Sequence, residues 1–134
     1  MRRIRAITLV AFVVAAVTVS TPASASCQTS DLKGTWFAFI ADLNVGEWER
    51  CKLKMDSGGR VSGAACTLAD GTRIPIVGGR LNVTSKCRLS GTLNFAGGVT
   101  AVLTQGQVSR SKGVASGVGF NNFGLLFAFT AIKR

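Results

Sequence analysis

Apolar and polar side chains alternate along much of the chain, with the period of two that is typical of half-buried antiparallel strands. In residues 50–55, three apolar positions alternate with three cations: Cys51, Leu53 and Met55 share one face, and Arg50, Lys52 and Lys54 share the other. Residues 87–95 repeat the pattern, with Cys87, Leu89, Leu93 and Phe95 opposite polar side chains. Because no segment after residue 25 follows a helical period, we predict an all-β protein.

Glycine-containing pairs divide this alternation into short segments and indicate turns, because glycine reaches positive φ without steric cost. Turns are expected at Gly58-Gly59, Asp70-Gly71, Gly78-Gly79 and Gly97-Gly98, and weaker ones near Gly106, Lys112-Gly113 and Asn121-Asn122. These turns define eight or nine short strands. The pairs recur at a spacing near 20 residues, which favours a meander with the pairs along one rim. A solenoid of the same period is the alternative, but a regular apolar ladder is missing.

Two segments are apolar on both faces: residues 36–40 and residues 125–129. At the edges of an open sheet such strands would be prone to aggregate. Pairing the two segments with each other closes the sheet and removes both edges. We therefore predict a small antiparallel up-and-down β-barrel of about eight strands.

The first 25 residues have the features of a secretory signal peptide. Arg2, Arg3 and Arg5 form a basic start, residues 7–19 are apolar, and Ala23-Ser24-Ala25 is a small-residue cleavage site. This apolar run is too short to span a bilayer, which takes ~20 residues, and no later segment comes closer. We predict a periplasmic or secreted protein in which residues 26–134 form a single barrel domain without a transmembrane segment. A lipid anchor on Cys27 is the alternative, although the large apolar residue expected three positions earlier is missing.

The four cysteines are expected to form two disulfides in an oxidising compartment. A hairpin centred on Gly58-Gly59 places Cys51 directly opposite Cys66, at a Cα separation that a disulfide accepts. Cys27 would then pair with Cys87. The alternative connectivity pairs Cys27 with Cys51 and Cys66 with Cys87.

A Gly-x-Trp motif opens the first predicted strand, in Leu32-Lys33-Gly34-Thr35-Trp36. This motif in a small exported barrel resembles the calycin group, which comprises lipocalins, avidins and the bacterial periplasmic inhibitors of metalloproteases. The stretch from Cys51 to Cys66 is most similar to the inhibitors, whose members carry a single disulfide across a comparable hairpin. Over residues 32–66 the resemblance implies a barrel that engages a protease.

The sequence departs from each of these relatives in a way that bears on function. The inhibitors insert a free N-terminal segment into the protease cleft, whereas a second disulfide would hold Cys27 here. Avidins line their cavity with several tryptophans, and this chain has only Trp36 and Trp48, so biotin binding is not expected. The chain is also short for a lipocalin with a roomy ligand cup.

Catalytic chemistry has little support in the sequence. The chain has no histidine, which excludes Ser-His-Asp and Cys-His nucleophile systems and histidine-dependent metal sites. Glu47 and Glu49 are spaced to share a face as an acid pair, but solvated charges beside a loop are the simpler interpretation. The cysteines form no Cys-x-x-Cys, and the glycine-rich loops lack phosphate-loop spacing. We expect no enzyme activity, no metal site and no cofactor.

The net charge of +10 makes the outer surface a candidate for binding. Arg50, Lys52 and Lys54 would project from one strand as a basic face, which attracts anionic polymers and surfaces. For an exported protein the anionic cell envelope is the nearest candidate, and a merely solubilising face is the alternative. Specific nucleic-acid binding is not expected, because few aromatic residues are interspersed among these cations.

A second candidate surface is the seam between the first and last strands. If Trp36 faces inward, Phe37 and Phe39 face outward, while Phe127 and Phe129 either extend this stripe or fill the core. An exposed aromatic stripe predicts self-association or a protein partner. A covering loop or N-terminal segment is the alternative.

Together these features predict an exported, non-catalytic binding protein, with a protease-inhibitor-like interaction module as the first interpretation. One alternative is a carrier of a small ligand or lipid inside the barrel, and another is a basic structural protein of the cell envelope. The size of the cavity tests the carrier, because an interior filled by core side chains leaves no room for a ligand.

Overall fold

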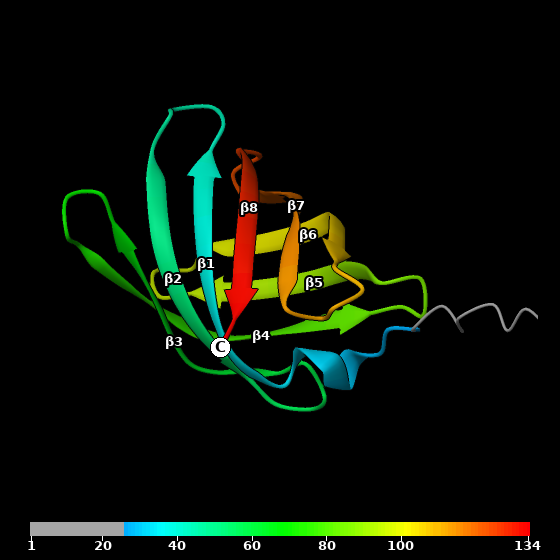
Figure 1. The fold of residues 1–134 in the computed structure, drawn as a ribbon. Helices are drawn as coiled ribbons and strands as arrows, with labels where there is room; N and C mark the ends of the chain where they lie inside the picture. The colour runs from blue at the N-terminus through cyan, green and yellow to red at the C-terminus, as the bar shows by residue number, and fades with distance from the viewer. Residues whose placement is uncertain (1–25) are drawn as a thin grey trace, which may run out of the picture.

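The computed structural model describes residues 26–134, and the predicted signal peptide, residues 1–25, lies outside the described residues. The described chain forms eight antiparallel strands that close into a barrel in simple up-and-down order, preceded by one short 3-10 helix (Figure 1). The elements are η1 (Thr29–Leu32), β1 (Gly34–Asp42), β2 (Trp48–Met55), β3 (Val61–Leu68), β4 (Arg73–Val83), β5 (Arg88–Phe95), β6 (Thr100–Val108), β7 (Val114–Asn121) and β8 (Leu126–Lys133). The predicted all-β barrel is confirmed.

The barrel closes where β1 pairs with β8. This pairing was predicted from residues 36–40 and 125–129, which are apolar on both faces. Phe37 lies opposite Ile132, and Ile40 lies opposite Phe129. Inward and outward positions alternate along β1, so Trp36 is 1% exposed while Phe39 is 48% exposed. Closure pairs the two terminal strands with each other and so removes the two edges that they would otherwise present.

Several glycines that we expected in turns lie inside strands. Gly78 and Gly79 are within β4, and Gly106 is within β6. A Cβ at Gly106 would lie 2.7 Å from the main-chain oxygen of Leu89 on the neighbouring strand. Gly79 and Gly106 therefore permit close approach of adjacent backbones, which is a known use of glycine inside a strand, whereas a Cβ at Gly78 would meet nothing within 4 Å.

The turn predictions at Gly78-Gly79 and near Gly106 are therefore wrong. The predicted turns at Gly58-Gly59, Asp70-Gly71, Gly97-Gly98 and Lys112-Gly113 do connect strands, and Asn121-Asn122 lies at the end of β7. The interpretation of the glycine pairs as one rim is also wrong. Gly58-Gly59 lies between β2 and β3 at one end of the barrel, whereas Gly97-Gly98 lies between β5 and β6 at the other.

Both predicted disulfides are present. Cys51 and Cys66 are register partners on β2 and β3, with their Cα atoms 3.9 Å apart. A bulge between Lys52 and Lys54 changes the register of the pairs that lie between the bulge and the turn. The hairpin is therefore symmetric about Gly58-Gly59 only on the side of the bulge that is farther from the turn, where Cys51 and Cys66 lie. The second disulfide joins Cys27 to Cys87 across a sequence separation of 60 residues.

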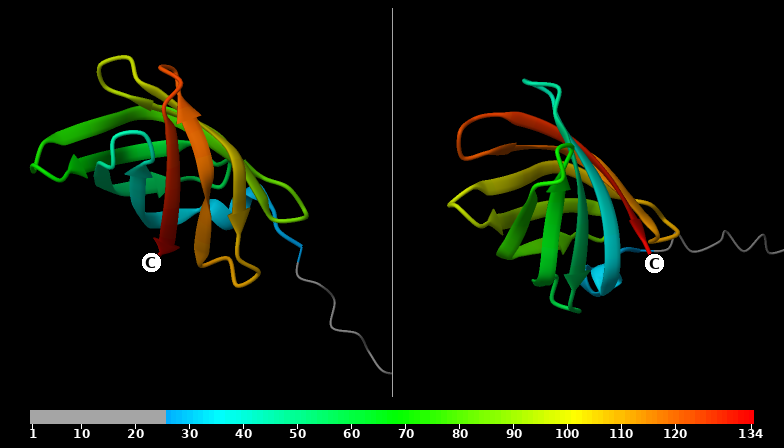
Figure 2. Two further views of the ribbon diagram at one scale, coloured as in Figure 1. Left: turned by 90° about the horizontal axis from the view of Figure 1, so that it is seen from above. Right: turned by 90° about the vertical axis from the view of Figure 1, so that its left-hand side faces the viewer.

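One end of the barrel is closed by η1. Figure 2 shows this short helix at the end opposite the β1–β2 loop. Leu32, at the end of η1, is 1% exposed, and its main-chain oxygen accepts a 2.8 Å hydrogen bond from Nε1 of Trp36. The side chain of Lys112 pairs with Asp31 at 3.1 Å, and Nζ of Lys133 donates to the main-chain oxygen of Asp31. With the Cys27–Cys87 disulfide, these contacts fix η1 as the floor of the barrel.

No helix within residues 26–134 has the length and apolar character needed to cross a bilayer.

Candidate functional site

A ring of small side chains leaves space inside the barrel. Cys51, Ala38, Ala131 and Ala115 are successive register partners on β2, β1, β8 and β7. Their side chains reach less far toward the axis than the leucines and phenylalanines of the remaining strands. The interior is therefore incompletely filled at this level, although both Trp36 and the leucines of the opposite wall are buried.

The resulting cavity has a volume of about 230 Å³. It extends from the floor residues Leu32 and Trp36 to the loop end of the barrel, where Trp48, Val99 and Leu125 line it. Most other lining side chains are apolar, and they come from all eight strands: among them are Ile40, Leu53, Leu68, Ile74, Leu93, Ala101, Leu103, Ala115, Phe127 and Ala131. The interior therefore has room for a small molecule.

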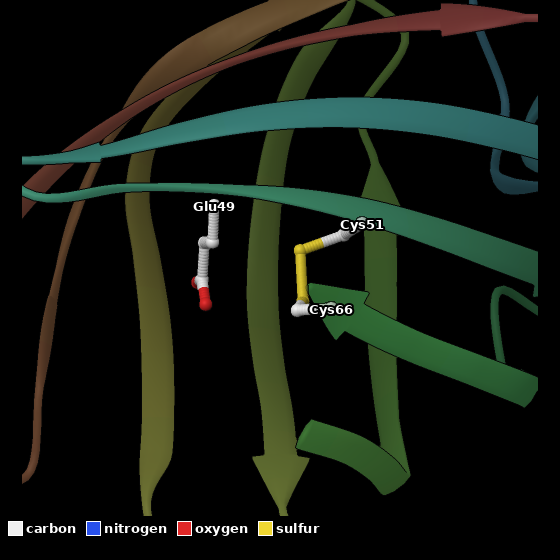
Figure 3. Close-up of side chains that lie close together, drawn as sticks. All are labelled: Glu49, Cys51 and Cys66. Carbon is white, nitrogen blue, oxygen red and sulfur yellow. A yellow bond between two sulfur atoms is a disulfide. The ribbon is translucent and has the colours of Figure 1, made fainter. Parts of the chain in front are cut away.

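Glu49 brings a carboxylate into this apolar space. On β2 it falls on the inward face with Cys51, and its register partners are Ile40 on β1 and Leu68 on β3. Figure 3 shows its side chain beside the Cys51–Cys66 disulfide, inside the wall formed by β2. No hydrogen bond from another described residue reaches this carboxylate. Burial raises the pKa of Glu49 above its ordinary value, and the negative charge of Asp42 raises that pKa further.

The other polar groups that line the loop end of the cavity are largely engaged. The Asp42 carboxylate accepts hydrogen bonds from the backbone N–H groups of Asn44 and Val45, which fixes the β1–β2 loop. Oδ1 of Asn121 likewise accepts from the backbone N–H groups of two residues in the β7–β8 loop. Glu49 is therefore the acidic group that is both inside the barrel and free to meet a ligand.

Glu47 and Glu49 do not form the acid pair considered from the sequence. Glu47 lies in the loop before β2 and is exposed at the mouth, whereas Glu49 lies within the barrel. The charge that acts on Glu49 is that of Asp42. Glu49 is therefore the carboxylate within the barrel, and Asp42 and Glu47 line the cavity nearer its mouth.

Glu49, Cys51 and Cys66 also lie close enough together to resemble a metal-binding cluster, since their ligand atoms are within 4.8 Å of one another (Figure 3). Both sulfurs are joined in the disulfide, so neither is a thiolate. Because the thiolate is the form of cysteine that binds metals, this cluster does not constitute a metal site.

The predicted surface residues divide into two groups. Phe37 and Phe39 point outward, as expected, and are 38% and 48% exposed. Phe127 and Phe129 do not extend that stripe, because they lie on the inward face of β8 and are 8% and 9% exposed. The prediction that Phe127 and Phe129 belong to an outer partner surface is therefore wrong, because both line the cavity. The basic face is present: Arg50, Lys52 and Lys54 are all exposed on the outer side of β2.

The sequence contains a signal for the inward position of Glu49. The alternation that places Cys51, Leu53 and Met55 on one face of β2 extends backward to Glu49. A charged residue in phase with an apolar face is a departure from the strand pattern, and such departures are expected at functional positions.

No protein-family model matches the chain, and no curated protein matches it. Solved structures do match its fold. A de novo designed fluorescence-activating β-barrel superposes with a TM-score of 0.61 at 15% identity and covers 76% of this chain and 93% of its own. The redesigned β-barrel b11L5F_LGL gives a TM-score of 0.63 at 17% identity, with 86% and 99% covered. The redesigned barrel mFAP1, bound to DFHBI, gives 0.64 at 19% identity, with 79% and 97% covered. The chain therefore has the fold of small closed barrels.

Proposed function

We propose that this protein binds a small, mainly apolar molecule inside the barrel and that Glu49 contacts a positively charged or hydrogen-bond-donating nitrogen of that molecule. The observation that carries the proposal is the 230 Å³ apolar cavity with an unpartnered carboxylate inside it. Ligand sites are typically apolar concavities with a few polar groups that orient the ligand. The protein acts here as a binder and not as an enzyme.

The volume indicates the size of the ligand. An engineered apolar cavity of about 150 Å³ holds benzene. At 230 Å³, this cavity suits one or two fused rings or a short branched chain. An intact lipid with two acyl chains is too large to be enclosed.

The charges around the cavity indicate its chemistry. Asp42, Glu47 and Glu49 line it, and no lysine or arginine is among its lining residues within the described chain. A carboxylate in an apolar environment is stabilised by a positive charge or a donated hydrogen bond. A ligand with a protonated nitrogen would supply both to Glu49, whereas an anionic ligand would add repulsion.

The redesigned barrel mFAP1, which has a similar fold, supports this use of the fold, because its structure is that of a barrel bound to the small molecule DFHBI. The two disulfides further support a location in an oxidising compartment outside the cytoplasm, as predicted from residues 1–25. The inhibitor-like interpretation gains less support. The N-terminal segment that such inhibitors insert into a protease is held here at the floor by the Cys27–Cys87 disulfide and the burial of Leu32.

Two probes with the same ring system and opposite charge test the proposal. Oxidised protein comprising residues 26–134, which contain every strand and both disulfides, would be titrated calorimetrically at about pH 7 with 1-naphthylmethylamine and with 1-naphthaleneacetate. We expect the amine to bind with a Kd of about 0.1–1 mM or lower and the acetate at least about tenfold more weakly. Glu49→Gln should remove the preference for the amine.

A matched pair of variants on β6 locates the binding. Ala101→Phe adds a ring on the inward face, where it fills the cavity, whereas Val102→Phe adds the same ring on the outward face. Binding should be lost in the first variant and retained in the second. Failure of both probes to bind, or equal binding by the two variants, would overturn the proposal.

A further inference from the structure

The outer surface of the barrel is strongly asymmetric. The strands β7, β8 and β1 are neighbours in the barrel, and Figure 1 shows them side by side. Exposed apolar side chains cover the outer face of all three strands. We call this surface the apolar wall; its members are Phe37, Phe39, Val114, Val118, Phe120, Leu126 and Ile132, each between 38% and 52% exposed. Apolar patches of this extent on a soluble protein mark an interaction site.

The members of the apolar wall are neighbours across strands. Phe37 and Val114 flank Ile132 in register, and Phe120 lies opposite Leu126. Only the small hydroxyl residues Thr130 and Ser116, in the row of Phe39, interrupt the apolar surface. On the other side of the barrel, the outward positions of β5 are polar: Arg88, Ser90, Thr92 and Asn94.

Cations border the apolar wall along β2. Lys52 and Arg50 are the register partners of Phe37 and Phe39. Nζ of Lys52 lies 5.9 Å from the centroid of the Phe37 ring, and Cζ of Arg134 lies 5.3 Å from it. Trp48 stacks on Phe39 with their centroids 5.4 Å apart. Aromatic rings with cations beside them are the side chains favoured where a protein meets the polar–apolar boundary of a membrane.

No carboxylate points outward from the strands of this surface. All six acidic residues of the chain are within the described residues. Asp31 is in η1, Asp42 and Glu49 line the cavity, and Glu47, Asp56 and Asp70 are in loops. The charges that point outward from the strand walls are therefore positive. An occupant of the apolar wall must accept apolar contact and supply negative charge at the β2 border.

We propose that the apolar wall and its β2 cations form a docking surface for an anionic lipid bilayer. The apolar side chains would contact the acyl–headgroup boundary, while Arg50, Lys52 and Lys54 bind lipid phosphates. A second copy of the chain is a poorer occupant. A two-fold contact would use the same patch on both copies and would leave the cationic borders of both without a negative partner, because no carboxylate points outward from the strands of this surface. This proposal is independent of the cavity, which lies on the other side of the wall.

Vesicle flotation tests the charge requirement. Oxidised protein comprising residues 26–134 would be mixed with phosphatidylcholine vesicles containing either no phosphatidylglycerol or about 30 mol %. Omitting residues 1–25 avoids binding through the apolar leader. We expect binding only to the anionic vesicles, with a loss of about tenfold or more when salt is raised from about 0.05 M to 0.5 M.

Charge-reversal variants on two parts of the barrel distinguish binding through this surface from a general electrostatic attraction to the vesicle. Lys52→Glu with Lys54→Glu changes the β2 border, and Arg73→Glu with Arg88→Glu makes the same change in net charge on β4 and β5. The first pair should weaken vesicle binding about tenfold or more, and the second by less than about threefold. Equal losses in the two would overturn the assigned surface, as would absence of binding by the unmodified protein.

Depth-dependent quenching tests the apolar contact. Trp48 is 39% exposed at the border, while Trp36 is 1% exposed inside the barrel. Anionic vesicles with brominated acyl chains should quench the emission of Trp48, and the Trp48→Phe variant should lose this quenching because only the buried Trp36 remains to emit. Binding without quenching would show attachment by charge alone and contradict the proposal. A concentration-dependent dimer that Phe39→Ser dissociates would identify a second copy as the occupant instead.

Discussion

Nε1 of Trp36 donates a 2.8 Å hydrogen bond to the main-chain oxygen of Leu32, which ties the inner wall of β1 to the helix that closes the barrel. Both residues are 1% exposed, so water cannot replace either partner. The Gly-x-Trp motif thus has a structural role at the floor. It fixes η1 four residues upstream and leaves the opposite end of the barrel as the entrance to the cavity.

Trp36→Phe should destabilise the protein by about 2 kcal/mol, because it leaves the buried oxygen of Leu32 without a donor and removes part of a packed ring. Urea unfolding at neutral pH measures this change. Trp48→Phe is the matched control, since Trp48 is exposed and should change the free energy of unfolding by less than about 0.5 kcal/mol. Equal effects of the two substitutions would contradict this role of Trp36.

The two disulfides should contribute differently to stability. In the chain-entropy model, the Cys27–Cys87 disulfide, with a separation of 60 residues, contributes about 4 kcal/mol. The Cys51–Cys66 disulfide, with a separation of 15, contributes about 3 kcal/mol. Paired cysteine-to-alanine variants, compared by denaturant unfolding, should show the larger loss for Cys27 and Cys87. A larger loss from the Cys51–Cys66 pair would show that this disulfide has a packing role beyond the entropic effect.

Gly106→Ala should cost about 1–3 kcal/mol, because the added Cβ would lie within 3 Å of the Leu89 backbone oxygen and side chain. Gly113→Ala is the control in the β6–β7 loop, where the nearest atom is Ser111 Oγ at 4.0 Å. Thermal unfolding distinguishes the two. A Gly106→Ala variant as stable as the Gly113→Ala variant would rule out the proposed close approach of β5 and β6.

Glu49 should make stability depend on pH in the direction opposite to that of an ion-paired carboxylate. Because its pKa is raised in the folded state, its favourable contribution is fully present below its ordinary pKa of about 4.5 and is lost as the pH rises through the raised value. Glu49→Gln should therefore be more stable than the unmodified protein at about pH 7 and equal to it at about pH 3.5. Urea midpoints of both proteins at the two pH values measure this difference. A destabilised Glu49→Gln variant at pH 7 would show that the carboxylate has a partner within the protein.

The same carboxylate should control ligand binding by pH. The affinity for 1-naphthylmethylamine should increase as the pH rises through the raised pKa of Glu49, until the amine itself loses its proton. In the Glu49→Gln variant, the affinity should stay flat over that range. A pH profile that is identical in the two proteins would remove Glu49 from the site.

The barrel and its disulfides were predictable because they depend on local patterns. The alternation around Cys51, the opposition of Cys51 to Cys66 and the doubly apolar end segments each constrain the topology directly. The strand glycines were harder to interpret, because Gly79 and Gly106 are needed where a neighbouring strand approaches. That requirement depends on curvature, which a single strand's sequence does not reveal.

The orientation of β8 and the cavity also required the structure. Residues 126–132 have apolar side chains on both faces, so the sequence cannot decide whether Phe127 and Phe129 face inward. Their burial follows from the pairing of β8 with β1. The cavity depends on Ala38, Ala131 and Ala115 falling at one level on three strands, and only the register across those strands brings them together.

The most direct test of ligand binding inside the barrel is a methyl NMR titration of the oxidised protein with 1-naphthylmethylamine. Ile40, Leu68 and Leu93 line the cavity, whereas Val114, Val118 and Ile132 lie on the apolar wall. We expect saturable shifts of the inner methyl resonances while the outer ones stay unchanged. Shifts confined to the outer residues, or no shifts at all, would contradict a ligand site in the barrel.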